Sequence, residues 1–209
     1  QILNYQLSLI LFRDSQLKKK WLGEKEPVLN QNITIGILGI GFLGSYVGKQ
    51  LNHIGYNVIG FKNSKPKNKY PFSILYKKKD LKKFLSQSNI VVSILPATPK
   101  TKYFINKSFL NKMKKNALLV NVGRGSTLNE KALIQHLKQN KNFHTSLDVF
   151  EYEPLIKKSL LWNLKNVTIT SHTASVTYLD SAIDYIYSKI EKHIKSGRIK
   201  SDVVLKKGY

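Results

Sequence analysis

Three polar residues stand where an α/β protein commonly places reactive groups. Arg124 follows the apolar segment ALLVNVG, Glu153 lies in SLDVFEYEPL, and His172 follows NVTITS. Open parallel sheets bind ligands at the carboxyl ends of their strands. The guanidinium fork of an arginine suits a planar carboxylate, and a carboxylate beside an imidazole orients the ring and favours its protonated form. These residue types predict an anion-binding arginine and a His–Glu acid pair.

Each of these residues also has a purely structural explanation when it is taken alone. A single Arg after a strand could form a surface ion pair, Glu153 could be an exposed loop acid, and a lone His is more often structural. We assign that structural role to the other histidines, which are His53, His136, His144 and His193. The co-occurrence of Arg124, Glu153 and His172 with a nucleotide-binding loop favours the chemical interpretation. Arg124 is also one of only three arginines among 35 basic residues.

The nucleotide-binding loop is the stretch GILGIGFLGSYVGKQL, which contains Gly39-x-Gly41-x-x-Gly44 between an apolar strand and a helix. The first glycine permits a tight turn, the second lets the backbone approach a pyrophosphate, and the third permits close helix–strand packing. The helix N-terminus adds free N–H groups and its positive dipole end. In this setting the motif is strong and predicts dinucleotide binding.

The loop after the second strand distinguishes NAD from NADP. NAD-binding chains place an acid about twenty residues after the glycines, where it accepts both ribose hydroxyls. The loop KNSKPK carries no acid and offers Asn63, Ser64 and Lys65 as donors to a 2′-phosphate. We therefore predict that NADP(H) is preferred and NAD(H) is possible, with a plain lysine-rich loop as the alternative.

Alternating segments place these motifs on a doubly wound α/β sheet. Continuous apolar strands separated by helices indicate a parallel sheet covered on both faces. The strands are predicted at 33–39, 57–61, 90–95, 117–122, 144–150 and 166–170. The helices are predicted at 5–20, 42–55, 79–88, 106–116, 129–140 and 178–197.

Composition limits the class of protein. The net charge of +23 is the footprint of a nucleic-acid binder, but it comes almost entirely from lysines spread along the chain, so we expect a solvated surface and no specific nucleic-acid partner. The absence of Cys excludes disulfides and thiolate metal sites, and no metal site is predicted. No apolar run reaches membrane-spanning length, and a cytoplasmic location is the simplest expectation.

The glycine loop, SILPATPKT, VNVGRGSTLNEKAL, SLDVFEYEPL and LWNLKNVTITSHTAS together closely resemble the D-isomer-specific 2-hydroxyacid dehydrogenases. The resemblance runs over nearly the whole chain, including the terminal SDVVLKKGY, and is strongest to the glyoxylate/hydroxypyruvate reductase A subgroup. It implies hydride transfer between a nicotinamide and C2 of a small 2-oxo acid. His172 would then be the proton donor, Arg124 would hold the substrate carboxylate, and Glu153 would support the imidazolium.

The resemblance also implies a set of cofactor contacts. Besides the three glycines, Asn63, Ser64, Lys65, Arg124 and His172, these are Phe42 and Leu43 at the pyrophosphate, Leu95, Pro96 and Thr101 on the adenosine and ribose side, Val122 and Gly123 before the arginine, and Asp148 at the nicotinamide carboxamide. Gly123 replaces a common Ala, which we expect to be a mild change.

The family's domain plan gives three expected segments. Residues 1–29 would form a linker helix and hinge, 30–176 the dinucleotide-binding domain, and 177–209 a helix and tail returning to a flavodoxin-like substrate domain. The N-terminal part of that domain has no counterpart here, so we expect an incomplete substrate domain and exposed apolar surface on the final helix. The helix at 5–20 resembles a dimer-interface element, which predicts a homodimer for the complete protein.

The expected function is therefore NADPH-preferring reduction of a glyoxylate- or hydroxypyruvate-type acid, an oxidoreductase activity. Two alternatives stay open: a non-catalytic dinucleotide-binding or regulatory module, and an inactive fragment of such an enzyme.

Overall fold

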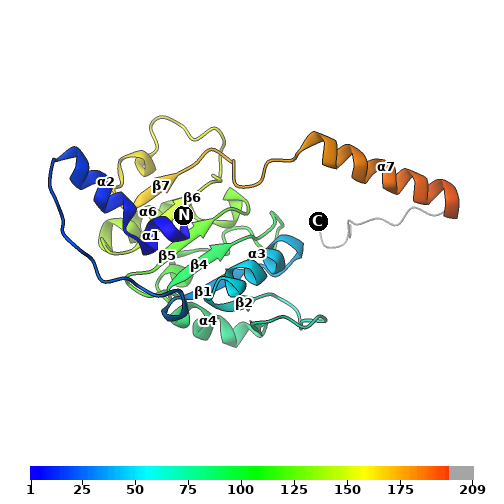
Figure 1. The fold of residues 1–209 in the computed structure, drawn as a ribbon, viewed down its shortest axis with the longest axis horizontal. Coiled ribbons are helices and arrows are strands. Elements are labelled where there is room, and N and C mark those ends of the chain that lie inside the picture. The colour runs from blue at the N-terminus through cyan, green and yellow to red at the C-terminus, as the bar shows by residue number, and fades with distance from the viewer. Residues whose placement is uncertain (198–209) are drawn as a thin grey trace.

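The computed structural model describes residues 1–197, and residues 198–209, which include most of the expected C-terminal tail, lie outside the described part. Seven parallel strands form one sheet in the order β3-β2-β1-β4-β5-β6-β7 (Figure 1). The strands are β1 Thr34–Leu38, β2 Asn57–Phe61, β3 Ser73–Leu75, β4 Ile90–Ser93, β5 Leu118–Asn121, β6 His144–Leu147 and β7 Val167–Ile169. The order reverses at β1, which pairs with both β2 and β4, so a switch point lies between the carboxyl ends of β1 and β4.

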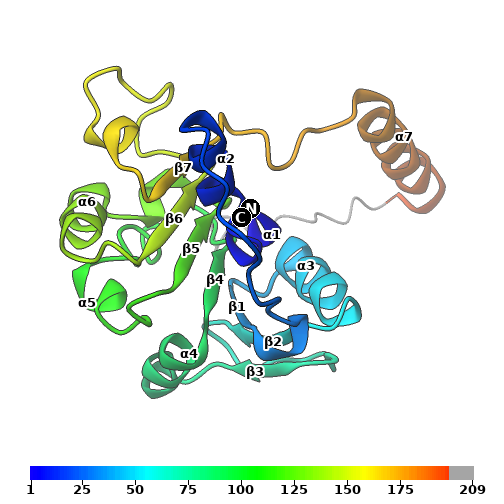
Figure 2. The same cartoon turned by 60° about the vertical axis from the view of Figure 1, so that its left-hand side comes forward.

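Helices cover both faces of the sheet, as a doubly wound fold requires. The helices are α1 Ile2–Gln6, α2 Leu9–Leu17, α3 Phe42–His53, α4 Leu81–Gln87, α5 Lys107–Leu110, α6 Glu130–Gln139 and α7 Leu179–Ser196, with short 3₁₀ turns η1 Asn30–Asn32, η2 Lys78–Asp80, η3 Gly125–Thr127 and η4 Leu160–Asn163. Figure 2 shows α4, α5 and α6 on one face and α1 and α3 on the other.

Two apolar clusters fill the spaces between these layers. Phe84 of α4, Leu110 of α5 and Leu137 of α6 are fully buried against one face. The other face buries Ile35 and Ile37 of β1 under α1 and α3. Burial of a side chain of this size contributes about 1.5–3 kcal/mol, so this packing stabilises the sheet that carries the loops at its edge. The Rossmann-type doubly wound sheet predicted from the sequence is confirmed.

Several element boundaries differ from the expectation. The single helix predicted at 5–20 is wrong, because Ser8 adopts a left-handed conformation (φ 55°) that separates α1 from α2. Tyr5 packs against the core, and its hydroxyl donates to the carbonyl of Asn116. These two contacts hold α1 against the sheet, and the chain turns at Ser8 before α2 begins. The helix predicted at 106–116 ends at Leu110, because the next residues form turns that bring Met113 into the core. The three-residue edge strand β3 was not predicted.

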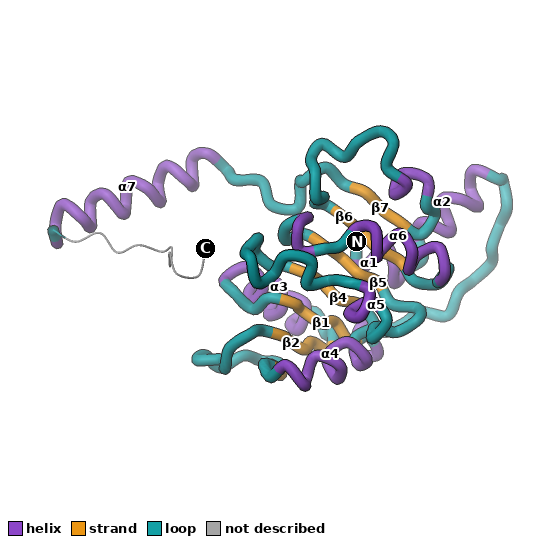
Figure 3. Tube along the Cα trace, turned by 180° about the vertical axis from the view of Figure 1, so that it is seen from behind, coloured by secondary structure: helices purple, strands orange, loops and turns teal. Residues whose placement is uncertain are grey.

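Helix α7 stands away from the sheet (Figures 1 and 3). None of its residues is buried, and Ile183, Ile186, Ile190 and Ile194 are all exposed. The expected exposed apolar surface on the final helix is therefore confirmed. No helix within residues 1–197 is long and apolar enough to cross a membrane.

Candidate functional site

The glycine loop connects β1 to α3 at the switch point. Gly39 has φ 102°, which only glycine adopts readily. A Cβ built on Gly44 would lie 1.9 Å from the carbonyl oxygen of Gly39, so α3 can start this close to the strand only with glycine at that position. A Cβ built on Gly41 would meet no atom within 4 Å, so the backbone there borders open space. This loop fits the pyrophosphate of a dinucleotide, which needs a tight turn beside an accessible backbone.

The first turn of α3 completes this cradle. Gly41 is the residue before the helix, and Phe42 and Leu43 follow it with 88% and 54% of their surface exposed. The N-terminus of a twelve-residue helix presents free N–H groups and a positive dipole end to an anion. The structure thus places both predicted pyrophosphate residues at the mouth of the glycine loop.

The basic loop after β2 lies beside the glycine loop. The N–H of Gly39 donates to the carbonyl of Phe61 at 2.9 Å, and the N–H of Lys62 donates to Leu75 at the end of β3. Asn63, Ser64 and Lys65 are exposed, and within residues 1–197 their side chains have no hydrogen-bond or ion-pair partner. Their donors are therefore available to a phosphate bound next to the glycines.

The loop after β4 turns sharply around a threonine. The Thr101 hydroxyl donates to the carbonyl of Pro96 at 2.6 Å and accepts from the N–H of Thr98 at 2.9 Å. Leu95 and Pro96 are partly buried, and the backbone of Leu95 lies against Gly123 in the loop after β5. The predicted adenosine- and ribose-side residues are thus brought together in one turn at the carboxyl end of β4.

The turn that carries Arg124 is held by a buried asparagine. Asn121 ends β5, its Oδ1 accepts from the N–H of Gly123 at 3.3 Å, and its Nδ2 donates to the carbonyl of Arg124 at 3.4 Å. A Cβ on Gly123 would lie 2.6 Å from the carbonyl oxygen of Leu95, a backbone atom. The expectation that Gly in place of Ala at position 123 is a mild change is therefore wrong for this geometry, because an Ala Cβ would require the backbone to shift. Val122 follows Asn121 and is partly buried.

Arg124 is exposed, and its guanidinium donates to the carbonyl of Gly123 at 2.8 Å. In the part of the chain that the structure describes, it makes no ion pair. Four of its five N–H donors therefore remain available to a planar anion such as a carboxylate.

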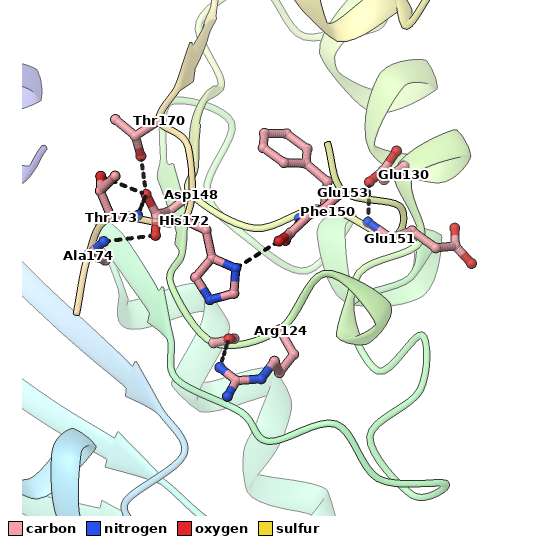
Figure 4. Close-up of polar contacts among 11 residues, drawn as sticks. Arg124, Glu130, Asp148, Phe150, Glu151, Glu153, Thr170, His172, Thr173 and Ala174 are labelled. Carbon is pink, nitrogen blue, oxygen red and sulfur yellow. Dashed lines mark hydrogen bonds and ion pairs between the residues drawn. The ribbon is translucent and has the colours of Figure 1, made fainter. Parts of the chain in front are cut away.

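His172 and Glu153, nineteen residues apart, meet at the carboxyl end of the sheet (Figure 4). His172 Nδ1 lies 2.7 Å from Glu153 Oε2, while Glu153 Oε1 accepts from the N–H of Phe150 at 2.9 Å. Burial alone would raise the pKa of Glu153, but the hydrogen bonds from His172 and Phe150 and the charge of His172 together lower it below its ordinary value. The pair therefore holds a carboxylate against the imidazole and leaves Nε2 of the ring for other partners.

Asp148 anchors the loop that carries His172. Its backbone carbonyl accepts from the N–H of His172 at 2.8 Å. Its Oδ1 accepts from the Thr170 hydroxyl and from the N–H of Thr173 at 3.0 Å, and its Oδ2 accepts from the N–H of Ala174 at 3.0 Å. Burial alone would raise the pKa of Asp148, but these hydrogen bonds and the charge of His172 lower it. Asp148 thus holds the loop on both sides of His172 through its main chain and its side chain.

A pocket of about 400 Å³ adjoins the pair. Its polar wall contains Asp148, Glu153 and His172, and its apolar wall contains Phe150 and Trp162. In Figure 4, Nε2 of the His172 ring points toward the side on which Arg124 lies. Among residues 1–197 no group of three or more His, Asp or Glu is placed to hold a metal ion.

Sequence reasoning missed the residues that hold this site in place. These are Asn121, Thr170, Thr173 and Ala174, together with Glu130 and Tyr103 on the neighbouring elements. A polar residue at the end of the apolar run ALLVN was a usable signal for Asn121. The others bond across 21 to 48 positions, so spacing gave no indication of them.

Comparison with known proteins identifies the family. Residues 2–174 match the model of the D-isomer specific 2-hydroxyacid dehydrogenase NAD binding domain. The chain is 31% identical over all 209 residues to the glyoxylate/hydroxypyruvate reductase A of Photorhabdus laumondii subsp. laumondii, and it spans 66% of the length of that relative.

Solved structures of 2-hydroxyacid dehydrogenases have the same fold as this chain. A D-isomer specific 2-hydroxyacid dehydrogenase from Xanthobacter autotrophicus Py2 in complex with NADPH and MES superposes with a TM-score of 0.92 at 32% identity, covering 100% of this chain and 85% of the other. The NADPH-dependent glyoxylate/hydroxypyruvate reductase of Sinorhizobium meliloti in complex with NADP and sulfate gives 0.89 at 27% identity, covering 98% and 65%. The chain therefore belongs to the D-isomer specific 2-hydroxyacid dehydrogenase family, and residues 2–174 correspond to the NAD binding domain of that family.

Proposed function

We propose that the protein reduces a small 2-oxo acid of the glyoxylate or hydroxypyruvate type to the 2-hydroxy acid, with NADPH preferred over NADH. The observation that carries the proposal is the 2.7 Å contact between His172 Nδ1 and Glu153 Oε2, at the sheet edge that also holds Arg124 and the glycine loop. The relatives' names support the same substrates and cofactor, since one is a glyoxylate/hydroxypyruvate reductase and another is NADPH-dependent.

The catalytic roles follow from the chemistry of the three side chains. Arg124 binds the substrate carboxylate and polarises the adjacent carbonyl. His172, with Nδ1 held by Glu153, carries a proton on Nε2 and donates it to the carbonyl oxygen as C2 is reduced. Glu153 keeps the ring oriented and stabilises the imidazolium. When it is bound, NADPH supplies the hydride.

The proposed cofactor contacts are those that the family resemblance implies, and their position around the switch point supports them. Gly39, Gly41 and Gly44 would border the pyrophosphate, and Asp148 would lie near the nicotinamide carboxamide. The remaining contacts would come from Phe42 and Leu43 in the first turn of α3 and from Asn63, Ser64 and Lys65 at the 2′-phosphate. The loops after β4, β5 and β7 would supply Leu95, Pro96, Thr101, Val122, Gly123, Arg124 and His172.

The same family plan supports a proposal for the domains. Residues 30–176 would form the dinucleotide-binding domain, with 1–29 as linker and 177–209 returning to a substrate domain. Exposed apolar side chains on α2, among them Leu9, Leu11 and Phe12, support a homodimer. Light scattering at two protein concentrations would test this, since a single monomer mass at both would contradict it.

The cofactor preference is tested by reversing one charge. In Lys65→Glu the carboxylate repels the 2′-phosphate, and we expect NADPH affinity to fall about tenfold, which is ~1.4 kcal/mol, while NADH affinity changes little. The control is Lys112→Glu, which reverses the charge of an exposed lysine just beyond α5, away from the loop after β2. Equal affinities for NADPH and NADH in the unsubstituted protein would refute the preference. Tight NADPH binding without turnover would favour a non-catalytic dinucleotide-binding module.

A further inference from the structure

The loop that carries Glu153 is held by hydrogen bonds to two residues other than Arg124, Glu153 and His172. Glu130, in the first turn of α6, accepts a hydrogen bond on Oε1 from the N–H of Glu151 at 2.8 Å. The Tyr103 hydroxyl donates to the carboxylate of the same Glu151. Backbone and side chain of Glu151 are thus each held by a different element, two residues before Glu153.

The same loop also contacts the turn that carries Arg124. A Cβ built on Gly125 would lie 1.8 Å from the carbonyl oxygen of Phe150, so the two backbones are in direct contact. The N–H of Tyr103 donates to the carbonyl of Ser126 at 2.9 Å in the same 3₁₀ turn. The loop 150–153 therefore lies between the Arg124 turn and the N-terminus of α6.

Successive N–H groups in this loop bind two different carboxylates. The N–H of Phe150 donates to Glu153 Oε1 at 2.9 Å, and the next one, from Glu151, donates to Glu130 (Figure 4). Glu130 is partly buried, and burial raises its pKa, as does the charge of Glu151, against the lowering effect of the hydrogen bond from Glu151. No ion pair within residues 1–197 involves Glu130. A partly buried carboxylate that accepts a hydrogen bond from a backbone N–H is placed to hold that backbone.

We propose that Glu130 is a positioning residue, which fixes the loop 150–153 so that Glu153 stays 2.7 Å from the imidazole of His172. Without the acceptor on Glu130, the Glu151 N–H turns toward water and the loop relaxes. Glu153 then loses the geometry in which both His172 and the Phe150 N–H bond it. Only the consequence for turnover rests on the proposed function.

The test follows the titration of Glu153 by carboxyl ¹³C NMR in the whole chain, with its signal assigned by Glu153→Gln. In Glu130→Ala we expect the midpoint of Glu153 to rise, because its pKa is lowered by hydrogen bonds that the loop holds in place. Glu130→Gln keeps an oxygen that can accept from Glu151 and should leave the midpoint unchanged. Glu130→Asp retains the charge but is one methylene shorter, so it should raise the midpoint as Glu130→Ala does, which keeps the test decisive if Glu130→Ala fails to fold.

Two outcomes would overturn the proposal. One is a reduced unfolding free energy in Glu130→Asp and Glu130→Ala with the Glu153 titration unmoved, which indicates a merely structural role. The other is a shift in Glu130→Gln but not in Glu130→Asp, which indicates that charge and not the hydrogen bond matters. With glyoxylate as substrate, kcat should fall by on the order of tenfold to a hundredfold in Glu130→Asp with NADPH affinity kept. If the protein does not reduce glyoxylate, the proposed function fails while the titration still decides the role of Glu130.

Discussion

Replacing Asp148 by Asn tests whether this carboxylate holds the His172 loop. The residue is 3% exposed, and its two oxygens accept from two backbone N–H groups, Thr173 on Oδ1 and Ala174 on Oδ2. An Asn side chain has one oxygen, so in either orientation one of these N–H groups faces an NH₂ donor. An unsatisfied buried donor costs about 1–3 kcal/mol. Because residues 173 and 174 are exposed enough for water to compensate in part, we expect a loss of about 1–2 kcal/mol.

Urea unfolding of the unsubstituted protein and Asp148→Asn would measure this loss, and its pH dependence adds a second test. The pKa of Asp148 is lowered in the folded state, so the carboxylate stabilises the fold above its unfolded pKa of about 3.9. The difference in unfolding free energy between the two proteins should therefore have its full value at neutral pH and shrink as the pH falls below about 4. A difference below about 0.5 kcal/mol at neutral pH, or one that grows on acidification, would refute the reasoning.

Three glycine substitutions separate packing from ligand contact. Gly44→Ala places a Cβ 1.9 Å from the Gly39 carbonyl oxygen, so both NADPH affinity and the unfolding free energy should fall, the latter by about 1–3 kcal/mol or more; normal stability in a thermal melt would contradict this. Gly41→Ala meets no protein atom within 4 Å and should keep its stability while calorimetry shows weaker NADPH binding. Gly123→Ala should lose about 1–3 kcal/mol through the overlap with Leu95, and an unchanged melting temperature would count against that contact.

The sequence predicted those parts of the fold that depend on continuous apolar runs. The strand expected at 57–61 has the bounds of β2, because its residues 58–61 form an apolar run that is buried or partly buried, as in a strand covered on both faces. The helix at 5–20 was wrong because its break at Ser8 is set by the docking of Tyr5 on the sheet, a tertiary contact with no local signal. The edge strand β3 has three residues, too few for periodicity to reveal it.

In the candidate site too, some residues could be predicted from the sequence and others could not. Residue type, position near strand ends and co-occurrence with the glycine loop selected His172 and Glu153, and the structure brings them into contact. The bonds of Asp148 to residues 170–174 and of Glu130 to Glu151 cross 21 to 26 positions, and they depend on which strands become neighbours. Such supporting contacts carry no motif of their own, so they emerged only from the three-dimensional structure.

In the proposed reaction, His172 transfers the proton in an NADPH-dependent reduction. The most direct measurement is glyoxylate-dependent oxidation of NADPH by the protein and by His172→Ala, with NADPH affinity measured in parallel. Loss of a general acid reduces turnover by about 10²–10⁴-fold, and we predict a loss of that size with NADPH affinity nearly unchanged. Equal turnover in the two proteins, or no glyoxylate-dependent oxidation in the unsubstituted one, would contradict the claim.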